Sequence, residues 1–265
     1  MRALSYPAFT ATAFQSRLAY RNQVWANAFG DLVNIFARIA LWTAAYAGMA
    51  TVDGVTLPEM VTYAVLVGSL LRWDHSQLLH DIGDAVRTGD VSIYLLRPLH
   101  YPLAVMASHV GHYVFELVTI VLPVVIIVGL TVGVLPPASL FHGVMFVAYW
   151  INSWLIMFCL AAICGLLAFW LLTAFSLEWF LTGILLLASG LVVPMWFLPP
   201  ALAASFSYLP FAWGFYYPAA VYLGKLDPMA SVLHLGIGIG WLAILALCLA
   251  WLWSKARHRM IVQGG

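Results

Sequence analysis

Residues 140–172 read LFHGVMFVAYWINSWLIMFCLAAICGLLAFWLL, and this stretch determines the class of fold. It contains no Asp, Glu, Lys or Arg, and it is longer than the roughly 20 residues that a helix needs to cross a hydrocarbon core about 30 Å thick. A soluble helix of this composition would have no polar face to present to water. The stretch therefore predicts a membrane-spanning helix.

The composition of the whole chain agrees with a bilayer environment. Of its 265 residues, 64% are hydrophobic and only 8% are charged, whereas soluble domains carry about 25% charged residues. The net charge is +1 and gives no sign of nucleic-acid binding. The three cysteines lie inside apolar runs, which argues against a disulfide framework or a metal site. We expect an all-α, polytopic membrane protein in which residues 1–265 form one transmembrane domain.

Six segments are long and apolar enough to be spans, and the basic residues give their orientation. If the N-terminus is cytoplasmic, ten of the 11 basic residues fall on the inner side, and only Lys225 lies outside. Both termini are then cytoplasmic. The expected spans are residues 30–50, 58–79, 105–134, 140–172, 177–197 and 230–253.

Two regions do not fit plain spans. Residues 5–29 mix basic and aromatic side chains and predict an amphipathic helix on the inner leaflet, with a frayed tail as the alternative. Residues 198–228 are rich in aromatic residues and interrupted by prolines. This pattern favours a re-entrant helical hairpin on the outer side, or alternatively an aromatic belt at the interface.

Two side-chain patterns inside the spans are candidates for function. Gly236 and Gly240 form a G-x-x-x-G pattern that favours close helix packing, either with another subunit or within the same one. His109, His112 and Glu116 share one face of a helix. They are interpreted as a polar intramembrane lining, and a substrate contact, a proton relay and a metal site remain alternatives.

Signatures of common enzymes are missing from the sequence. There is no phosphate-binding G-x-x-x-x-G-K-[ST] motif, no H-E-x-x-H and no G-x-S-x-G. We therefore expect a transporter subunit that is not itself an enzyme, binds no cofactor or metal, and depends on a partner for any use of ATP.

The inner loop, residues 80–104, contains the most specific pattern. Residues 81–103 read DIGDAVRTGDVSIYLLRPLHYPL. The G-D-x-x-x-Y-L-L-R-P pattern within it resembles that of type-two ABC exporter permeases with six spans. The stretch LPFAWGFYYPAAVYLGK, residues 209–225, is similar to the segment before the last span of the same subfamily.

This resemblance implies partners and a coupling element. Two permease subunits, identical or paralogous, would assemble in the membrane lipid with two cytoplasmic ABC ATPase subunits, which bind the ATP and Mg²⁺. The inner loop would place a coupling helix in a groove of the ATPase. By position, the ATPase-coupling residues are Gly89, Asp90, Tyr94, Leu95, Leu96, Arg97 and Pro98.

The residue types in this loop suit such a contact independently. A glycine permits a helix to end at Gly89, and Pro98 stops the following element. An apolar patch at 94–96 in a cytoplasmic loop usually marks a partner site, and Arg97 adds an orienting polar contact. Alternatively, the patch lies back against the bilayer.

The function expected from the sequence is an exporter permease in the bacterial cytoplasmic (inner) membrane. Its substrate pathway would run along the subunit interface, lined mainly by the first, second and fifth spans. A proton-coupled secondary transporter using Glu116 and the histidines is the alternative. A membrane enzyme acting on lipid is less favoured because no catalytic constellation is visible.

Overall fold

The computed structural model describes residues 5–18, 21–71, 75–91, 100–171 and 175–263, and the structure is 83% helical. The chain begins with two helices, α1 (Ser5–Leu18) and α2 (Arg21–Tyr46). A short hairpin of β1 (Thr51–Val52) and β2 (Val55–Thr56) follows α2. The remaining helices are α3 (Leu57–Val65), α4 (His75–Thr88), α6 (Tyr101–Glu116), α7 (Leu122–Thr131), α8 (Leu140–Leu171), α9 (Phe175–Ala188), α10 (Pro200–Ser207), α11 (Tyr216–Tyr222) and α12 (Pro228–Gln263).

Four short helical turns complete the described elements, and two of them are π-helical. The π turn η1 (Leu66–Leu70) continues α3, and η2 (Leu117–Val121) joins α6 to α7. The 3-10 turns η3 (Met195–Phe197) and η4 (Pro210–Trp213) lie between α9 and α11.

Local sequence explains the start of α3. Asp53 and Gly54 have positive φ angles of 49° and 73°, which suits the tight two-residue turn of the β1–β2 hairpin. Thr56 then caps α3 in a capping box with Glu59, and Pro58 occupies the first turn, where its missing N–H is harmless.

Four helices among the described residues are long and apolar enough to cross a membrane. They are Gln23–Tyr46, Tyr101–Thr131, Leu140–Leu171 and Pro228–His258. The helix Ser176–Ala188 is apolar but shorter. The prediction of a nearly all-α membrane protein is therefore confirmed.

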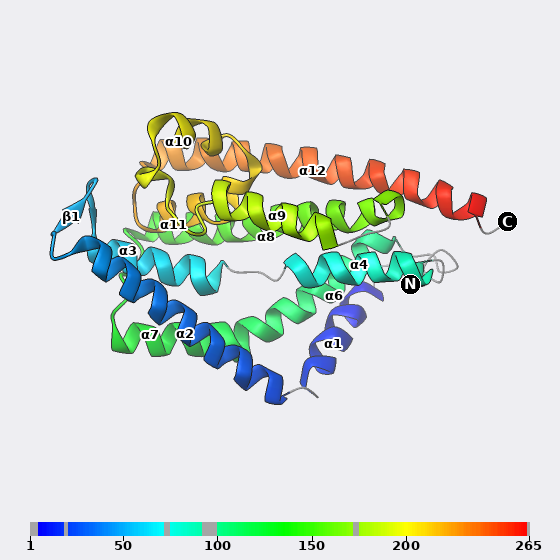
Figure 1. Ribbon diagram of the computed structural model, residues 1–265, viewed down its shortest axis with the longest axis horizontal. Helices are drawn as coiled ribbons and strands as arrows, with labels where there is room; N and C mark the ends of the chain where they lie inside the picture. Colours follow the sequence, from blue (N-terminus) through cyan, green and yellow to red (C-terminus); the bar gives the residue numbers. More distant parts are fainter. Residues whose placement is uncertain (1–4, 19–20, 72–74, 92–99, 172–174, 264–265) are drawn as a thin grey trace.

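Helix α8 occupies the centre of the molecule. It packs against α4, α11 and α12 (Figure 1), and half of its most apolar window is buried, compared with 11% for α2 and 17% for α12. The start of α1 and the C-terminal end of α12 lie at one end of the molecule, while the β1–β2 hairpin and α10 lie at the other (Figure 1). The exposed faces of α2 and α12 are therefore available to lipid or to another subunit.

A separate small apolar cluster attaches α2 to the rest of the fold. Ile35 and Ile39 of α2 pack there against Val61 and Val65 of α3, together with residues of η2 and α7. Helix α1 instead packs along α6, where Gly111 lets the Thr10 carbonyl approach closely.

The element boundaries differ from the sequence expectations in several places. The region 5–29 contains two helices, because α1 ends at Leu18 and α2 already begins at Arg21. The expected span 58–79 is divided between α3–η1 and α4, and α4 continues to Thr88. The inner loop expected over 80–104 therefore begins as helix, and α12 extends beyond the expected end at residue 253.

The helix expected over 177–197 ends at Ala188 for an identifiable reason. Gly190 has a φ of 83°, and its carbonyl oxygen accepts a hydrogen bond of 2.8 Å from the buried Tyr63 hydroxyl. A left-handed residue held in this way cannot continue an α-helix. The region after Gly190 contains the short elements η3, α10, η4 and α11, and α11 is largely buried.

Candidate functional site

Helix α2 carries a polar stripe along an otherwise apolar candidate span. The stripe consists of Gln23, Asn27, Asp31, Asn34 and Arg38, which are spaced three or four residues apart and so share one face. Gln23 donates to Asn27 over 3.2 Å, and Arg38 Nε donates to Asn34 Oδ1 over 2.9 Å. Polar groups inside a membrane span are costly unless they face a cavity or a partner group.

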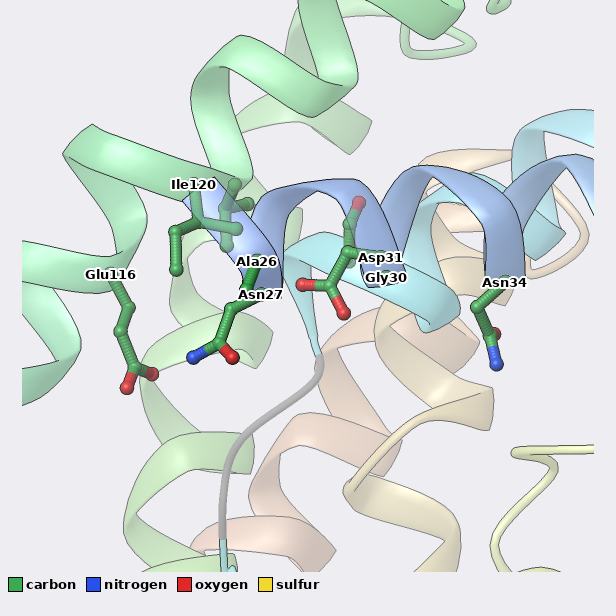
Figure 2. Close-up of a pocket in the computed structure, with 9 residues that line it drawn as sticks. Ala26, Asn27, Gly30, Asp31, Asn34, Glu116 and Ile120 are labelled. Atoms are coloured by element: carbon green, nitrogen blue, oxygen red, sulfur yellow. The ribbon is translucent and has the colours of Figure 1, made fainter. Parts of the chain in front are cut away.

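The stripe opens onto a pocket of about 430 Å³ between α2, η1 and the α6–η2 junction. Figure 2 shows Asn27 and Asp31 extending from α2 and Glu116 extending from the neighbouring helix. The lining residues are Ala26, Asn27, Gly30, Asp31, Asn34, Ser69, Glu116, Ile120 and Val121.

Both π-helical turns in the described ranges border this pocket. Ser69 belongs to η1, Ile120 and Val121 belong to η2, and Glu116 immediately precedes η2. A π turn displaces the backbone from the regular α-helical pattern and is found frequently at functional sites. Two such turns facing one polar cavity mark this region of the membrane domain as a candidate site.

Arg38 connects the stripe to the segment after α9. Its guanidinium donates a hydrogen bond of 2.8 Å to the Leu191 carbonyl oxygen, in addition to the bond to Asn34. The Arg38 side chain also passes beside η1, since a Cβ at Gly68 would lie at an ordinary contact distance of 3.7 Å from Arg38 Cδ. The stripe is thereby linked to both the η1 and the α9 regions.

At the other end of the fold, α4 is joined to three helices by polar contacts. Gln77 accepts a hydrogen bond from Arg17 of α1 over 2.5 Å, and His80 lies 2.7 Å from Glu178 of α9. His75 lies 3.2 Å from Thr182, also of α9, and Asp81 lies 3.2 Å from His109 of α6. A displacement of α4 would therefore be felt by α1, α6 and α9 together.

The three residues expected to form an intramembrane lining do not form one site: the two histidines lie together, and Glu116 lies apart from them. The rings of His109 and His112 meet with centroids 5.4 Å apart, near Asp81. His112 Nδ1 is buried and has no hydrogen-bond partner among the described residues. Glu116, one turn further along α6, lines the polar pocket instead. The described residues contain no group of three His, Cys, Asp or Glu side chains placed to hold a metal.

Only part of the expected coupling element lies within the described ranges. Gly89 follows α4 with a φ of 81°, and Asp90 accepts a hydrogen bond of 2.8 Å from the Thr88 hydroxyl. Tyr94, Leu95, Leu96, Arg97 and Pro98 lie outside the residues that the structure describes.

The close-packing glycine of α12 is Gly238. A Cβ at Gly238 would overlap the Trp213 indole and approach Asn152 Nδ2 to 2.7 Å, whereas Gly236 and Gly240 have nothing within 4 Å of the corresponding position. The G-x-x-x-G face is thus exposed within this chain.

Asn27, Asp31 and Asn34 were not predicted as site residues from the sequence. Asp31 and Asn34 lie inside the first expected span, residues 30–50, but Asn27 precedes it, so the stripe as a whole was not predicted. The structure shows that α2 begins at Arg21, so all three lie on one helix with Arg38.

The fold and the site define an integral membrane protein in which apolar helices enclose a polar pocket. The chain belongs to the ABC-2 family of transporter proteins, whose family pattern matches residues 32–264. It is therefore a membrane transport subunit, as the resemblance in the inner loop indicated, and such subunits work with ABC ATPases. No curated protein and no solved structure matches the chain.

Proposed function

We propose that this chain is the permease of an ATP-driven exporter in the bacterial inner membrane, acting as a dimer with two separate ATPase subunits. The polar pocket of about 430 Å³ between α2, η1 and η2 is the observation that carries the proposal. Its carboxylate and amide groups lie on two of the candidate spans, Gln23–Tyr46 and Tyr101–Thr131. Polar groups inside a span usually mark a substrate path.

The proposed pathway lies along the exposed face of α2. Trp25 and Phe29 of that helix are 75% and 70% exposed in the single chain, which suits a helix covered by lipid and by a second permease. The Arg38 bond to Leu191 brings the end of the fifth apolar segment to the same region. The fifth segment thus lies beside a pocket that the first, second and third spans line, so the proposed pathway includes the third span as well as the first, second and fifth.

Six crossings are proposed for the chain. They comprise α2, α3–η1 with α4, α6–η2–α7, α8, α9 with the residues after it, and α12. This path puts the start of α1 and the end of α12 on one side (Figure 1), as cytoplasmic termini require.

Single cysteines at Thr51, Ser139 and Asp227 in a cysteine-free background should then react with an impermeant reagent from outside, and those at Thr88 and Arg257 should not.

Helix α4 is proposed to transmit the ATPase movement. It leads directly into the segment that contains Gly89 and Asp90, and its polar side chains contact α1, α6 and α9. Nucleotide-driven displacement of that segment would thus move the helices around the pocket without any ATP bound by the permease itself.

A proton-coupled transporter is the second candidate, and it is favoured by one observation. Asp81, His109 and His112 form a run of titratable groups that points along α6 toward Glu116. The two histidine rings meet edge to face and do not hydrogen-bond to each other directly. A proton could therefore pass between them only through hydrogen-bonded water.

One experiment separates the two candidates. The chain is reconstituted into vesicles together with an ABC ATPase that copurifies with it, and efflux is measured with ATP or with an imposed proton gradient. ATP-dependent transport that survives a protonophore supports the exporter. Transport without the ATPase that follows the proton gradient would overturn it.

A further inference from the structure

The aromatic segment 195–226 and the beginning of α12 line a second, open pocket of about 420 Å³, away from the polar pocket. Its walls come from η3, α10, α11 and the beginning of α12, at the end of the molecule that carries α10 (Figure 1). The aromatic members of the lining are Trp196, Tyr208, Tyr216, Tyr217 and His234.

Four of these rings are in successive contact and form one wall, in which the buried Tyr217 supports the partly exposed rings beside it. Trp196 and Tyr216 have centroids 5.4 Å apart, Tyr216 and Tyr217 are 5.2 Å apart, and Tyr217 and His234 are 4.7 Å apart. The successive planes are inclined by 54°, 67° and 27°, so the wall is curved. Tyr208 is 66% exposed and stands at the rim.

The wall is held in place by contacts that do not involve a ligand. The Tyr217 hydroxyl donates to the Ser207 carbonyl over 3.1 Å, which ties α11 to α10. Trp213 Nε1 donates to the His234 carbonyl over 2.8 Å, and Tyr63 packs edge-on against Trp196 at 5.1 Å. A preformed wall lowers the entropic cost of binding.

The chemistry of the lining restricts the ligand. The described lining residues include no Asp, Glu, Lys or Arg. The Ser207 hydroxyl is already bonded to the Ala204 carbonyl, and the Tyr217 hydroxyl is bonded to the Ser207 carbonyl. Trp196 Nε1 and His234 Nδ1 have almost no accessible surface, so these two nitrogens are not available to a ligand.

We propose that this outer aromatic pocket binds a quaternary ammonium group. Such a cation has no N–H to satisfy, and it is attracted to the electron-rich faces of Trp and Tyr within about 6 Å of the ring centre. The pocket binds it whether or not the cation is the transported substrate. The group can belong to a small soluble cation or to a lipid headgroup, and the test distinguishes these sources.

The test uses the purified full-length chain in detergent, with its ATPase if the two copurify, and isothermal titration with choline. The matched neutral compound is 3,3-dimethyl-1-butanol, in which carbon replaces the charged nitrogen. Saturable choline binding is expected, with the neutral compound binding much more weakly. Equal binding of the two compounds, or no saturable choline binding, would overturn the proposal.

Variants locate the site on the aromatic wall. Tyr216→Leu and Tyr208→Leu each remove one ring and should weaken choline binding by about 2- to 30-fold. Tyr216→Phe and Tyr208→Phe keep the rings and should bind like the unmodified chain. Trp251→Leu, which removes an exposed aromatic ring on α12 outside the pocket, is the control. Because Tyr208 is at the rim, its Leu variant remains informative even if Tyr216→Leu does not fold. Unchanged binding in a folded Tyr→Leu variant contradicts the assignment.

Nanodiscs distinguish the source of the cation. If phosphatidylcholine nanodiscs weaken choline binding relative to phosphatidylethanolamine nanodiscs, the site accepts the lipid headgroup. Equal choline affinity in both assigns the pocket to a soluble cation. Both results support the quaternary-ammonium site, and loss of binding in both lipids would count against it.

Discussion

Arg38 of α2 donates a hydrogen bond of 2.8 Å to the Leu191 carbonyl oxygen, and the same guanidinium donates to Asn34 over 2.9 Å. Two donors of one planar group thus hold a helix side chain and a loop backbone that are far apart in sequence. Leu191 directly follows Gly190, whose left-handed conformation ends the α9 segment. The end of that segment is therefore tied to the polar stripe on α2.

The first prediction concerns this two-donor contact. Arg38→Lys should lower the free energy of unfolding in detergent by about 1.5–3 kcal/mol, and with it the melting temperature. The reason is that an ammonium group cannot make both bonds in the planar geometry. It should also reduce transport-coupled ATP hydrolysis. Arg87→Lys, at an exposed position on α4, is the control and should be neutral. An unchanged melting temperature for Arg38→Lys would contradict the proposed link.

The second prediction concerns the packing of α1 on α6. A Cβ at Gly111 would overlap the Thr10 carbonyl oxygen and lie 3.0 Å from Ala13 Cβ. Gly111→Ala should therefore cost about 1–3 kcal/mol and displace α1, which increases tryptic cleavage after Arg17.

A glycine on the continuation of the same helix provides the control. Gly129 of α7 has nothing within 4 Å of its Cβ position, so Gly129→Ala should be neutral or stabilising by about 0.5–1 kcal/mol. Equal proteolysis of the two variants would show that α1 does not depend on this contact.

The apolar pattern made the class of fold predictable, because a run such as 140–172 has one stable environment. Helix α8 accordingly spans Leu140–Leu171, close to the expected limits. Boundaries were less predictable where one tertiary contact decides them. The Tyr63 hydroxyl bond to Gly190 joins residues 127 positions apart, and no local pattern reveals that partner.

The candidate site was partly predictable for a similar reason. Glu116 was identified because a carboxylate in an apolar span is conspicuous, but its neighbours depend on how α2 lies against η2. Asn27 and Asp31 can be recognised as pocket residues only once that packing is known. The aromatic character of 198–228 was evident in the sequence, whereas the curved wall formed with His234 of α12 required the fold.

The third prediction concerns the glycines of α12. Gly238→Ala should lower the free energy of unfolding by about 1–3 kcal/mol, since the new methyl group overlaps Trp213. Gly236→Ala should leave the single chain as stable as before. If the Gly236 and Gly240 face contacts a second permease, Gly236→Leu should reduce dimer recovery in crosslinking and size-exclusion measurements. Unchanged dimer recovery would show that the Gly236 and Gly240 face does not contact a second permease and is covered by lipid instead.

The fourth prediction concerns the carboxylate in the polar pocket. Glu116→Gln should fold and change transport-coupled ATP hydrolysis by less than about fivefold, because the amide retains hydrogen-bonding capacity. Glu116→Leu should be more harmful, since it makes this part of the pocket apolar. Complete loss of transport in a normally assembled Glu116→Gln variant would favour the proton-coupled alternative.

The fifth prediction concerns the ATPase-coupling segment after Gly89. A double change, Tyr94→Ala with Leu95→Asp, should abolish association with the ATPase. Interface energy concentrates in a few buried aromatic and aliphatic anchors, each contributing about 2 kcal/mol or more. The new aspartate would also bury an unpaired charge. Arg97→Lys should preserve more binding but impair coupling, because lysine cannot reproduce the planar guanidinium.

The chain offers a matched control for that double change. Tyr208 and Leu209 form the same dipeptide at the α10 end of the molecule, and they are 66% and 37% exposed. Tyr208→Ala with Leu209→Asp should leave ATPase association intact, since this end would face outward in the proposed topology. The measurements are recovery of the ATPase in a detergent pull-down and substrate-stimulated ATP hydrolysis. Normal recovery and coupling with the Tyr94 and Leu95 variant would refute the assignment of the segment, while loss in both double variants would indicate a general folding defect.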